Sequence, residues 1–171
     1  MTFMELAAKR YSVRSFSDRP VEKEKLDELL KAGNLAPTAK NIQPQRIYVL
    51  QSPEALKKLS ELSPCVYGAA TVLLFAYDAD EEWKNPMEEG VHAGVEDVSI
   101  VATHVMLRAA ELGLDTCWCN YFANSEVEKA FGLPDNEKVV LFLDVGYAAP
   151  DAGPAPGHSA KKPLSDTVRY L

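Results

Sequence analysis

Two short segments near the N-terminus carry side chains suited to binding a phosphate and a planar ring. Arg10, Ser12 and Arg14 occupy alternate positions, and on an extended backbone this spacing places all three side chains on one face while Val13 points to the core. Two guanidiniums and one hydroxyl on one face match the needs of a phosphate monoester dianion. The alternative is a solvated basic stretch paired with acids such as Asp18.

The second segment is a loop at residues 36–44 that is enclosed by two prolines. Each proline biases the residue before it away from helical geometry, so we expect Ala36 and Gln43 to be extended. Thr38, Asn41 and Gln43 offer neutral donors and acceptors, which suit the polar edge of a planar heterocycle better than a metal ion. An ordinary polar connection is the alternative.

Together these segments resemble two motifs of the nitroreductase family of FMN enzymes. In that family an Arg-x-Ser-x-Arg element near the N-terminus and a later Asn-x-Gln-Pro element both touch the flavin. The matching residues here are Arg10, Ser12 and Arg14 for the first element and Asn41, Gln43 and Pro44 for the second. The resemblance continues through residues 94–118, 146–147 and 161–164, so it covers nearly the whole chain.

The resemblance implies a non-covalently bound FMN whose phosphate and ribityl end is held by the N-terminal segment and by Lys161, Lys162 or both. It also implies that Asn41 faces the polar edge of the isoalloxazine, and that backbone amides near Cys119 and Asn120 lie beside the reactive flavin nitrogen. Many relatives have Gly at the position of Asn120, and the usual arginine of the tail is replaced by the two lysines, which act as point charges. The candidate cofactor-binding residues are Arg10, Tyr11, Ser12, Arg14, Thr38, Asn41, Gln43, Cys119, Asn120, Lys161 and Lys162.

The activity implied by the resemblance is hydride transfer from NADH or NADPH to the flavin, and then to a nitroaromatic, a quinone or another small electron-poor acceptor, with ping-pong kinetics. No side chain is expected to be catalytic in its own right, because the cofactor carries the chemistry. The sequence contains no Walker loop, no G-x-G-x-x-G and no H-E-x-x-H. The alternatives are a flavin- or nucleotide-binding sensor without turnover, and a family cousin with specialised dehydrogenase or dehalogenase chemistry.

Three aromatic residues are candidates for the walls of the acceptor pocket, although core packing is the more usual role for any one of them. They are Tyr67, Trp83 and Phe122. The acidic segment 78–90 is expected to be a surface excursion, and its length permits a lid. If it overhangs the site, its negative charge disfavours NADPH relative to NADH.

The composition is that of a globular chain without a nucleic-acid or membrane partner. The 171 residues suffice for one domain, 1–171, whose core needs no disulfide or metal. The net charge of -7 argues against binding to nucleic acid or to an anionic membrane. The first five residues lack the basic start and apolar block of a signal peptide, so we expect a cytoplasmic protein.

The cysteines and histidines predict no metal site. Cys65, Cys117 and Cys119 include no C-x-x-C pair, and the last two share one face of an expected strand as buried reduced thiols. His92 and His104 are separated by about 18 Å of helix rise, which is too far to share a metal ion.

Hydrophobic periodicity predicts helices and strands in mixed order. The expected helices lie near residues 3–10, 21–34, 91–112 and 124–132, with one more that begins after Ser52. The expected strands are 47–50, 71–77, 116–122 and 139–145, with residues 167–171 as a further edge strand. The resemblance implies an α+β fold, in which an antiparallel-dominated sheet is flanked by helices and an extended C-terminal tail embraces a partner subunit.

The expected helix at 91–112 is apolar on more than one side. A helix of this kind must be covered from several directions, and one small domain has few elements with which to cover it. A homodimer built on this helix is the economical explanation, and a wholly intramolecular core is the alternative. A charge at Ala102 is therefore expected to give a monomer or a misfolded chain.

Overall fold

The computed structural model describes all 171 residues of the sequence. The helices are α1 (Phe3–Lys9), α2 (Lys23–Asn34), η1 (Ala39–Asn41, a 3-10 turn), α3 (Pro53–Leu62), α4 (Gly94–Glu111), α5 (Asn124–Phe131) and α6 (Leu164–Thr167). The strands are β1 (Gln45–Leu50), β2 (Thr71–Asp78), β3 (Asp115–Cys119) and β4 (Glu137–Gly146). The strands form one sheet in the order β1-β2-β4-β3, and every neighbouring pair is antiparallel. The predicted α+β class with an antiparallel sheet is confirmed.

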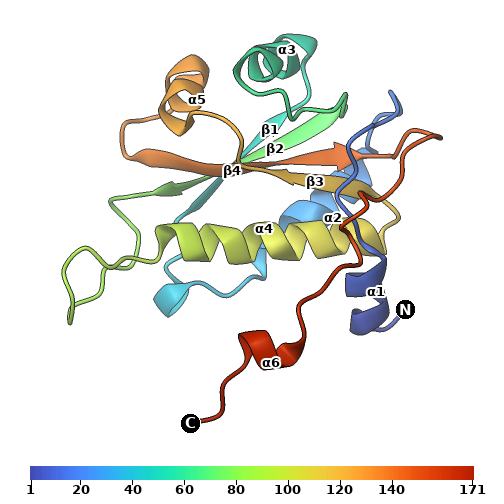
Figure 1. The fold of residues 1–171 in the computed structure, drawn as a ribbon. Coiled ribbons are helices and arrows are strands. Elements are labelled where there is room, and N and C mark those ends of the chain that lie inside the picture. The colour runs from blue at the N-terminus through green and yellow to red at the C-terminus, as the bar shows by residue number, and fades with distance from the viewer.

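Helices cover both faces of this sheet. Figure 1 shows α2 and α4 against one face and α3 and α5 against the other. One buried cluster joins Leu29 of α2 and Val105 of α4 to Leu73 of β2. A second cluster joins Leu59 of α3 and Val127 of α5 to the opposite face of the sheet. Because β2 is buried on both faces, it reads as a continuous apolar run, as the sequence predicted.

The helix ends follow the capping signals in the sequence. Thr2 accepts a hydrogen bond from the amide of Glu5, whose carboxylate reaches back to the amide of Thr2, which forms a capping box at the start of α1. Ser52 caps α3, which has Pro53 in its first turn. At the end of α5, Gly132 adopts a φ of 67°, in the left-handed region that a residue with a side chain rarely occupies.

The central helix α4 begins at Gly94, three residues later than predicted from the apolar period. The carboxylate of Glu82 accepts the amide of Gly94 at 2.9 Å and so satisfies one free donor of the first turn. A Cβ at position 94 would collide with the ring of Tyr77 and with this same carboxylate. Glu82 and Asp78 are both buried, so the prediction that segment 78–90 lies wholly outside the core was wrong at these two acids.

One side of α4 packs inside the chain and the other does not. Val98, Val101 and Ala102 are fully buried against α2 and the sheet. Ala102 therefore belongs to the core of the chain itself, and the expectation that it lies on a subunit contact was wrong. Val95 is 53% exposed and Ile100 is 37% exposed on the outer side, so the predicted excess of apolar surface is present there.

The C-terminal residues do not form the edge strand that was expected at 167–171. Leu164–Thr167 forms the short helix α6, and residues 168–171 are exposed coil. Figure 1 shows this tail leaving the body on the side of α1 and α4, away from the free edge at β1. None of the helices combines the length and the apolar composition needed to cross a bilayer. The cytoplasmic location stays a prediction.

Candidate active site

The segment with the alternating arginines lies beside the start of β3. Ser12 forms a parallel bridge with Thr116, and the amide of Val13 donates to the carbonyl of Thr116 at 3.0 Å. Val13 is fully buried, so its predicted inward orientation is confirmed. The pairing with the sheet fixes the backbone of this segment, and it leaves Arg14 exposed.

The arginines of this segment have no carboxylate partner. Neither Arg10 nor Arg14 takes part in any of the ion pairs of the chain, and Asp18 pairs with neither of them. The guanidinium of Arg14 donates only to the carbonyl of Ser12, at 3.3 Å. In a chain with a net charge of -7, these two guanidiniums are positive charges that no acid of the chain neutralises.

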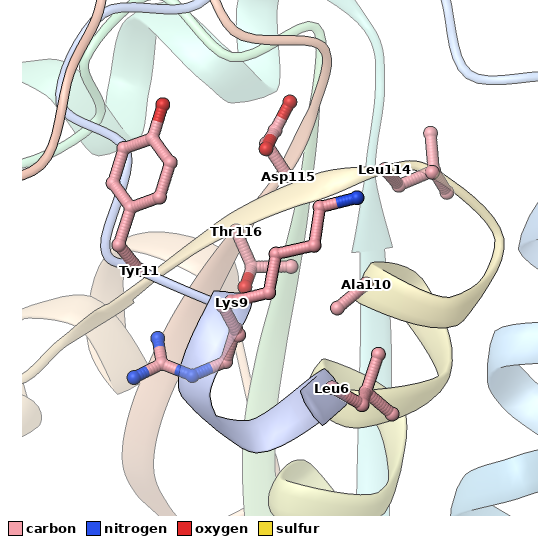
Figure 2. A pocket seen from close by; sticks show the side chains of 9 residues that line it. Leu6, Lys9, Tyr11, Ala110, Leu114, Asp115 and Thr116 are labelled. Carbon is pink, nitrogen blue, oxygen red and sulfur yellow. The ribbon is translucent and has the colours of Figure 1, made fainter. Parts of the chain in front are cut away.

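A hollow of about 190 Å³ opens between this segment, α1 and the C-terminal end of α4. Figure 2 shows Lys9 and Tyr11 projecting from the N-terminal segment over the start of β3, where Asp115 and Thr116 lie. Asp115 accepts the amide of Ala148 at 2.9 Å, so its carboxylate is occupied by the backbone that follows β4. Lys9 was not among the predicted site residues, because its position one residue before the motif gave no signal.

The C-terminal tail passes the same region. The rings of Tyr11 and His158 meet edge to face, with their centroids 6.0 Å apart. Lys161 follows three residues later and donates to the carbonyl of His158 at 2.9 Å. Lys161 and Lys162 are exposed and lack acidic partners. The contact of Tyr11 with His158 thus joins the tail to the N-terminal segment at a residue that also accepts a hydrogen bond from Lys161.

The amide-bearing loop has an unusual backbone. Lys40, Asn41 and Gln43 have φ values of 51°, 55° and 58°, in the left-handed region that favours glycine. The prediction that Gln43 is extended was therefore wrong. Its amide donates to Thr38 Oγ1 at 3.0 Å, and this contact inside the loop overrides the preference imposed by the following proline. Such conformations cost free energy, and they cluster at functional sites where the surrounding structure holds them.

Asp97 attaches this loop to the N-terminal end of α4. Its Oδ1 accepts the amide of Ala39 at 2.8 Å, while its Oδ2 is buried without a hydrogen-bond partner. Burial, together with the nearby charges of Glu96 and Glu82, raises the pKa of Asp97 above its ordinary value. Asn41 and Gln43 themselves are exposed. The loop is therefore held to α4 by Asp97, and the side-chain amides of Asn41 and Gln43 are exposed to solvent.

The arginine segment and the amide loop lie at opposite ends of α4. The loop contacts Asp97 in the first turn of the helix, whereas Arg10 lines a hollow with Ala110 at its other end. Position 110 follows position 97 by 13 residue steps, which correspond to about 20 Å of helix rise. One chain therefore does not bring Arg10 and Asn41 together around one flavin-sized ligand.

The remaining predicted residues lie at the far end of β3. Cys119 is the last residue of the strand, and its side chain is buried. The strand was expected to continue to residue 122, but the exposed Asn120 leaves it and donates from its side chain to the carbonyl of Val140 at 2.8 Å. A glycine at this position could not make that contact. Asn120 thus has a structural role in this chain.

The three aromatic residues expected around an acceptor do not form one wall. Phe122 packs against Phe142, with ring centroids 5.3 Å apart, and the hydroxyl of Tyr67 donates to Cys65 Sγ at 3.3 Å. Both lie with the core cluster under α3 and α5. Trp83 lies elsewhere, just before α4, where its carbonyl accepts a hydrogen bond from the amide of Ala93. Core packing is the role that the structure shows for Phe122 and Tyr67.

A buried group of titratable side chains lies under the arginine segment. Cys117 and Cys119 are free thiols on one face of β3, as expected, and Asp144 faces them from β4. A hydrogen bond from Cys119, helped by the charges of Arg14 and Arg10, lowers the pKa of Cys117 to about 7, and burial raises the pKa of Asp144 to about 9. Sequence spacing could not reveal this group, since only the pairing of β3 with β4 brings Asp144 to the cysteines.

Comparison with known proteins establishes the family. A model of the nitroreductase family matches residues 7–65 and 61–147. A relative from Archaeoglobus fulgidus, whose name combines NADH dehydrogenase with NAD(P)H nitroreductase, is 31% identical over 145 residues and aligns with 81% of this chain and 80% of its own length. A nitroreductase family protein from Clostridium difficile is 41% identical, with a TM-score of 0.91 over 99% of this chain and 98% of its own. The chain belongs to the nitroreductase family. It is therefore an enzyme of the oxidoreductase class.

Two further relatives have names that refer to a flavin. The FMN reductase [NAD(P)H] of Bacillus subtilis is 30% identical over 171 aligned positions, which cover 89% of this chain and 65% of that protein. An FMN-dependent nitroreductase from Clostridium difficile is 27% identical, with a TM-score of 0.78 over 98% of both chains.

Proposed function

We propose that this chain is an FMN-dependent NAD(P)H oxidoreductase that passes hydride through the flavin to a small electron-poor acceptor of the nitroaromatic or quinone type. The observation that carries the proposal is the pair of unpaired guanidiniums on a segment fixed to the sheet, in a member of the nitroreductase family. The names of the relatives from Bacillus subtilis and Clostridium difficile support FMN as the cofactor.

The N-terminal segment and the tail fit the phosphate end of FMN. Arg10 and Arg14 supply charge-assisted donors and Ser12 supplies a hydroxyl on a backbone that the bridge to Thr116 holds in place. Lys161 and Lys162 add positive charge from the tail, and Tyr11 holds the tail through His158. None of these positively charged side chains is paired with a carboxylate of the chain, so all of them are available to a phosphate dianion.

The loop at 38–43 fits the polar edge of the flavin ring. Asn41 and Gln43 are exposed, and the hydrogen bonds to Thr38 and Asp97 hold their backbone in a strained form before any ligand binds. Bound FMN supplies the hydride chemistry, and the part of the chain is to orient the ring and to place donors at its polar edge.

The separation of these two regions along α4 supports a site shared between two copies of the chain. In a homodimer whose two α4 helices run antiparallel, the loop of one copy lies at the same end as the arginine segment of the other. The exposed Val95 and Ile100 on α4, with Phe3 and Met4 on α1, offer the apolar surface for such a contact.

Because no second nucleotide-binding fold is present, the nicotinamide donor and the acceptor are expected to use the same face of the flavin in turn. This alternation gives ping-pong kinetics. The acidic segment 78–90 lies before α4, near the loop that holds Asn41, and its charge disfavours the additional phosphate of NADPH relative to NADH if it covers the site.

The decisive experiment is a visible spectrum of the purified protein followed by steady-state oxidation of NADH and NADPH with a quinone. Flavin absorbance, turnover and parallel double-reciprocal lines are expected. Bound flavin without turnover would instead identify a sensor. Intersecting lines would show a ternary complex of enzyme, donor and acceptor, and they would contradict the shared-face mechanism.

A further inference from the structure

Three potential metal ligands meet in the core between β3 and β4. Cys117 and Asp144 are direct cross-strand partners, and Cys119 lies two residues further along the same face. All three side chains are at least 96% buried. One ligand atom from each residue lies within 4.8 Å of the other two. The cluster is therefore compact and shielded from water, and it lies on two rigid neighbouring strands.

The spacing agrees with tetrahedral coordination. With Zn–S bonds of about 2.3 Å and Zn–O bonds of about 2.1 Å, the sulfur and oxygen ligands of a tetrahedral zinc ion lie about 3.6 Å apart. The distance from Cys119 Sγ to Asp144 Oδ2 is 3.6 Å. The carbonyl oxygen of Cys65 lies 3.2 Å from Cys119 Sγ, which places a fourth donor at the edge of the same cluster.

Asp144 lacks the partners that a buried carboxyl group normally has. Its Oδ1 is buried with no hydrogen-bond partner, and its Oδ2 accepts a hydrogen bond only from the thiol of Cys119. In its ionised form, such a group is a cost in an apolar core unless a cation satisfies it, and one of its oxygens lies within 4.8 Å of both cysteine sulfurs. Two thiolates and one carboxylate around a divalent ion leave a single net negative charge.

We propose that Cys117, Cys119 and Asp144 form a structural site for a thiophilic divalent cation of the zinc type, with the carbonyl of Cys65 as the fourth donor. The ion joins β3 to β4 one residue along from the bridge between Ser12 and Thr116. It therefore stabilises the part of the sheet on which the arginine segment lies. This site uses buried side chains, whereas the flavin contacts expected near Cys119 come from backbone amides, and its test needs no turnover.

The test uses the full chain produced under reducing conditions in a medium that contains Co²⁺, because a buried site is loaded as the protein folds. Metal analysis is expected to give one cobalt per chain, and the spectrum is expected to contain a thiolate-to-cobalt charge-transfer band after the flavin contribution is subtracted. Growth with Zn²⁺ is expected to replace the band with one zinc per chain. A parent protein that lacks metal under both conditions would overturn the proposal, as would one in which Cys117 and Cys119 are joined in a disulfide.

Three variants locate the ligands. Cys117→Ser and Asp144→Asn are expected to lose at least about tenfold in metal retained per chain during dialysis against a chelator, since each removes one donor. Cys65→Ser removes a neighbouring thiol but keeps the carbonyl, so it is expected to retain the parent metal content. Equal metal loss in all three variants, or in none of them, would overturn the assignment. The spectrum of the parent protein decides the question if a variant does not fold.

Discussion

Arg14 and Arg19 are near neighbours in the chain but have different electrostatic surroundings. Arg19 forms an ion pair of 2.6 Å with Glu22, and its guanidinium lies 3.8 Å from the ring centroid of Tyr147. The guanidinium of Arg14 has only one hydrogen bond within the chain, to the carbonyl of Ser12. Arg19 is thus occupied by its own chain, whereas Arg14 is free to bind a ligand.

This contrast predicts the effect of two matched substitutions on flavin binding. Arg14→Ala removes a charge-assisted contact worth about 1.5 to 3 kcal/mol, so we expect a ten- to hundredfold weaker affinity for FMN. Arg19→Ala is the control and is expected to leave the affinity unchanged. Fluorescence titration of the flavin-free proteins measures both, and superimposable curves for Arg14→Ala and the parent would refute the role of Arg14.

Asp97 predicts a pH dependence of stability, because its pKa is raised by burial and by Glu96 and Glu82. A carboxyl group whose pKa is higher in the folded than in the unfolded chain contributes stability below its unfolded pKa, and loses that contribution as the pH rises through the folded value. Asp97→Asn keeps an oxygen that can accept the amide of Ala39 and removes the ionisation. The free energy of unfolding of the variant, relative to the parent, should therefore increase from acidic to neutral pH. Urea unfolding across this range measures it, and a difference that is constant with pH would exclude ionisation of Asp97 as the cause.

At the level of elements, the hydroxyl of Thr38 is one of the groups that hold the loop at 38–43. Thr38→Val removes the acceptor for the amide of Gln43, so we expect a loss of about 1 kcal/mol in the free energy of unfolding and weaker flavin binding as the loop relaxes. Thr38→Ser keeps the hydroxyl and is the control. Unfolding curves and flavin titrations that do not separate the two variants would show that this bond does not hold the loop.

The elements that the sequence predicted well are those specified by local chemistry. Ser52 and Pro53 mark the start of α3, and the apolar run at 71–77 marks the central strand, because capping and burial act within a few residues. The start of α4 was misplaced because it depends on Glu82, twelve residues away along the chain. The backbone of Gln43 was misjudged because the contact with Thr38 outweighs the effect of its proline.

The candidate site was predictable only in part, for the same reason. The inward Val13 follows from the period of an extended segment. The contact of Tyr11 with His158 and the meeting of Asp144 with the cysteines depend on tertiary pairing, which spacing along the chain does not encode. The distance between the arginine segment and the amide loop is also a tertiary property, because it is set by the length of α4.

At the scale of the whole molecule, the outer side of α4 predicts self-association. Ile100→Glu places a charge where apolar surface is expected to be buried between two copies, so we expect a monomer. Val49→Glu is the control, since Val49 is 39% exposed on β1 and Ile100 is 37% exposed. Sedimentation velocity measures the association state of both variants. A parent protein that is monomeric at micromolar concentration would rule out the dimer.

The shared site makes a stronger prediction, because Arg14 and Asn41 should then serve one flavin from different copies. Co-expression of an Arg14→Ala chain with an Asn41→Ala chain gives mixed dimers in which one site carries both substitutions and the other carries neither. Half of the sites in the mixed dimer should therefore bind FMN with the parent affinity, although each variant alone binds weakly throughout. If one chain held the whole site, every site in the mixed dimer would carry one substitution and no fraction of parent affinity would appear. Titration of mixed dimers purified with two different tags tests this, and a single weak phase would contradict a site built across the two copies at the ends of α4.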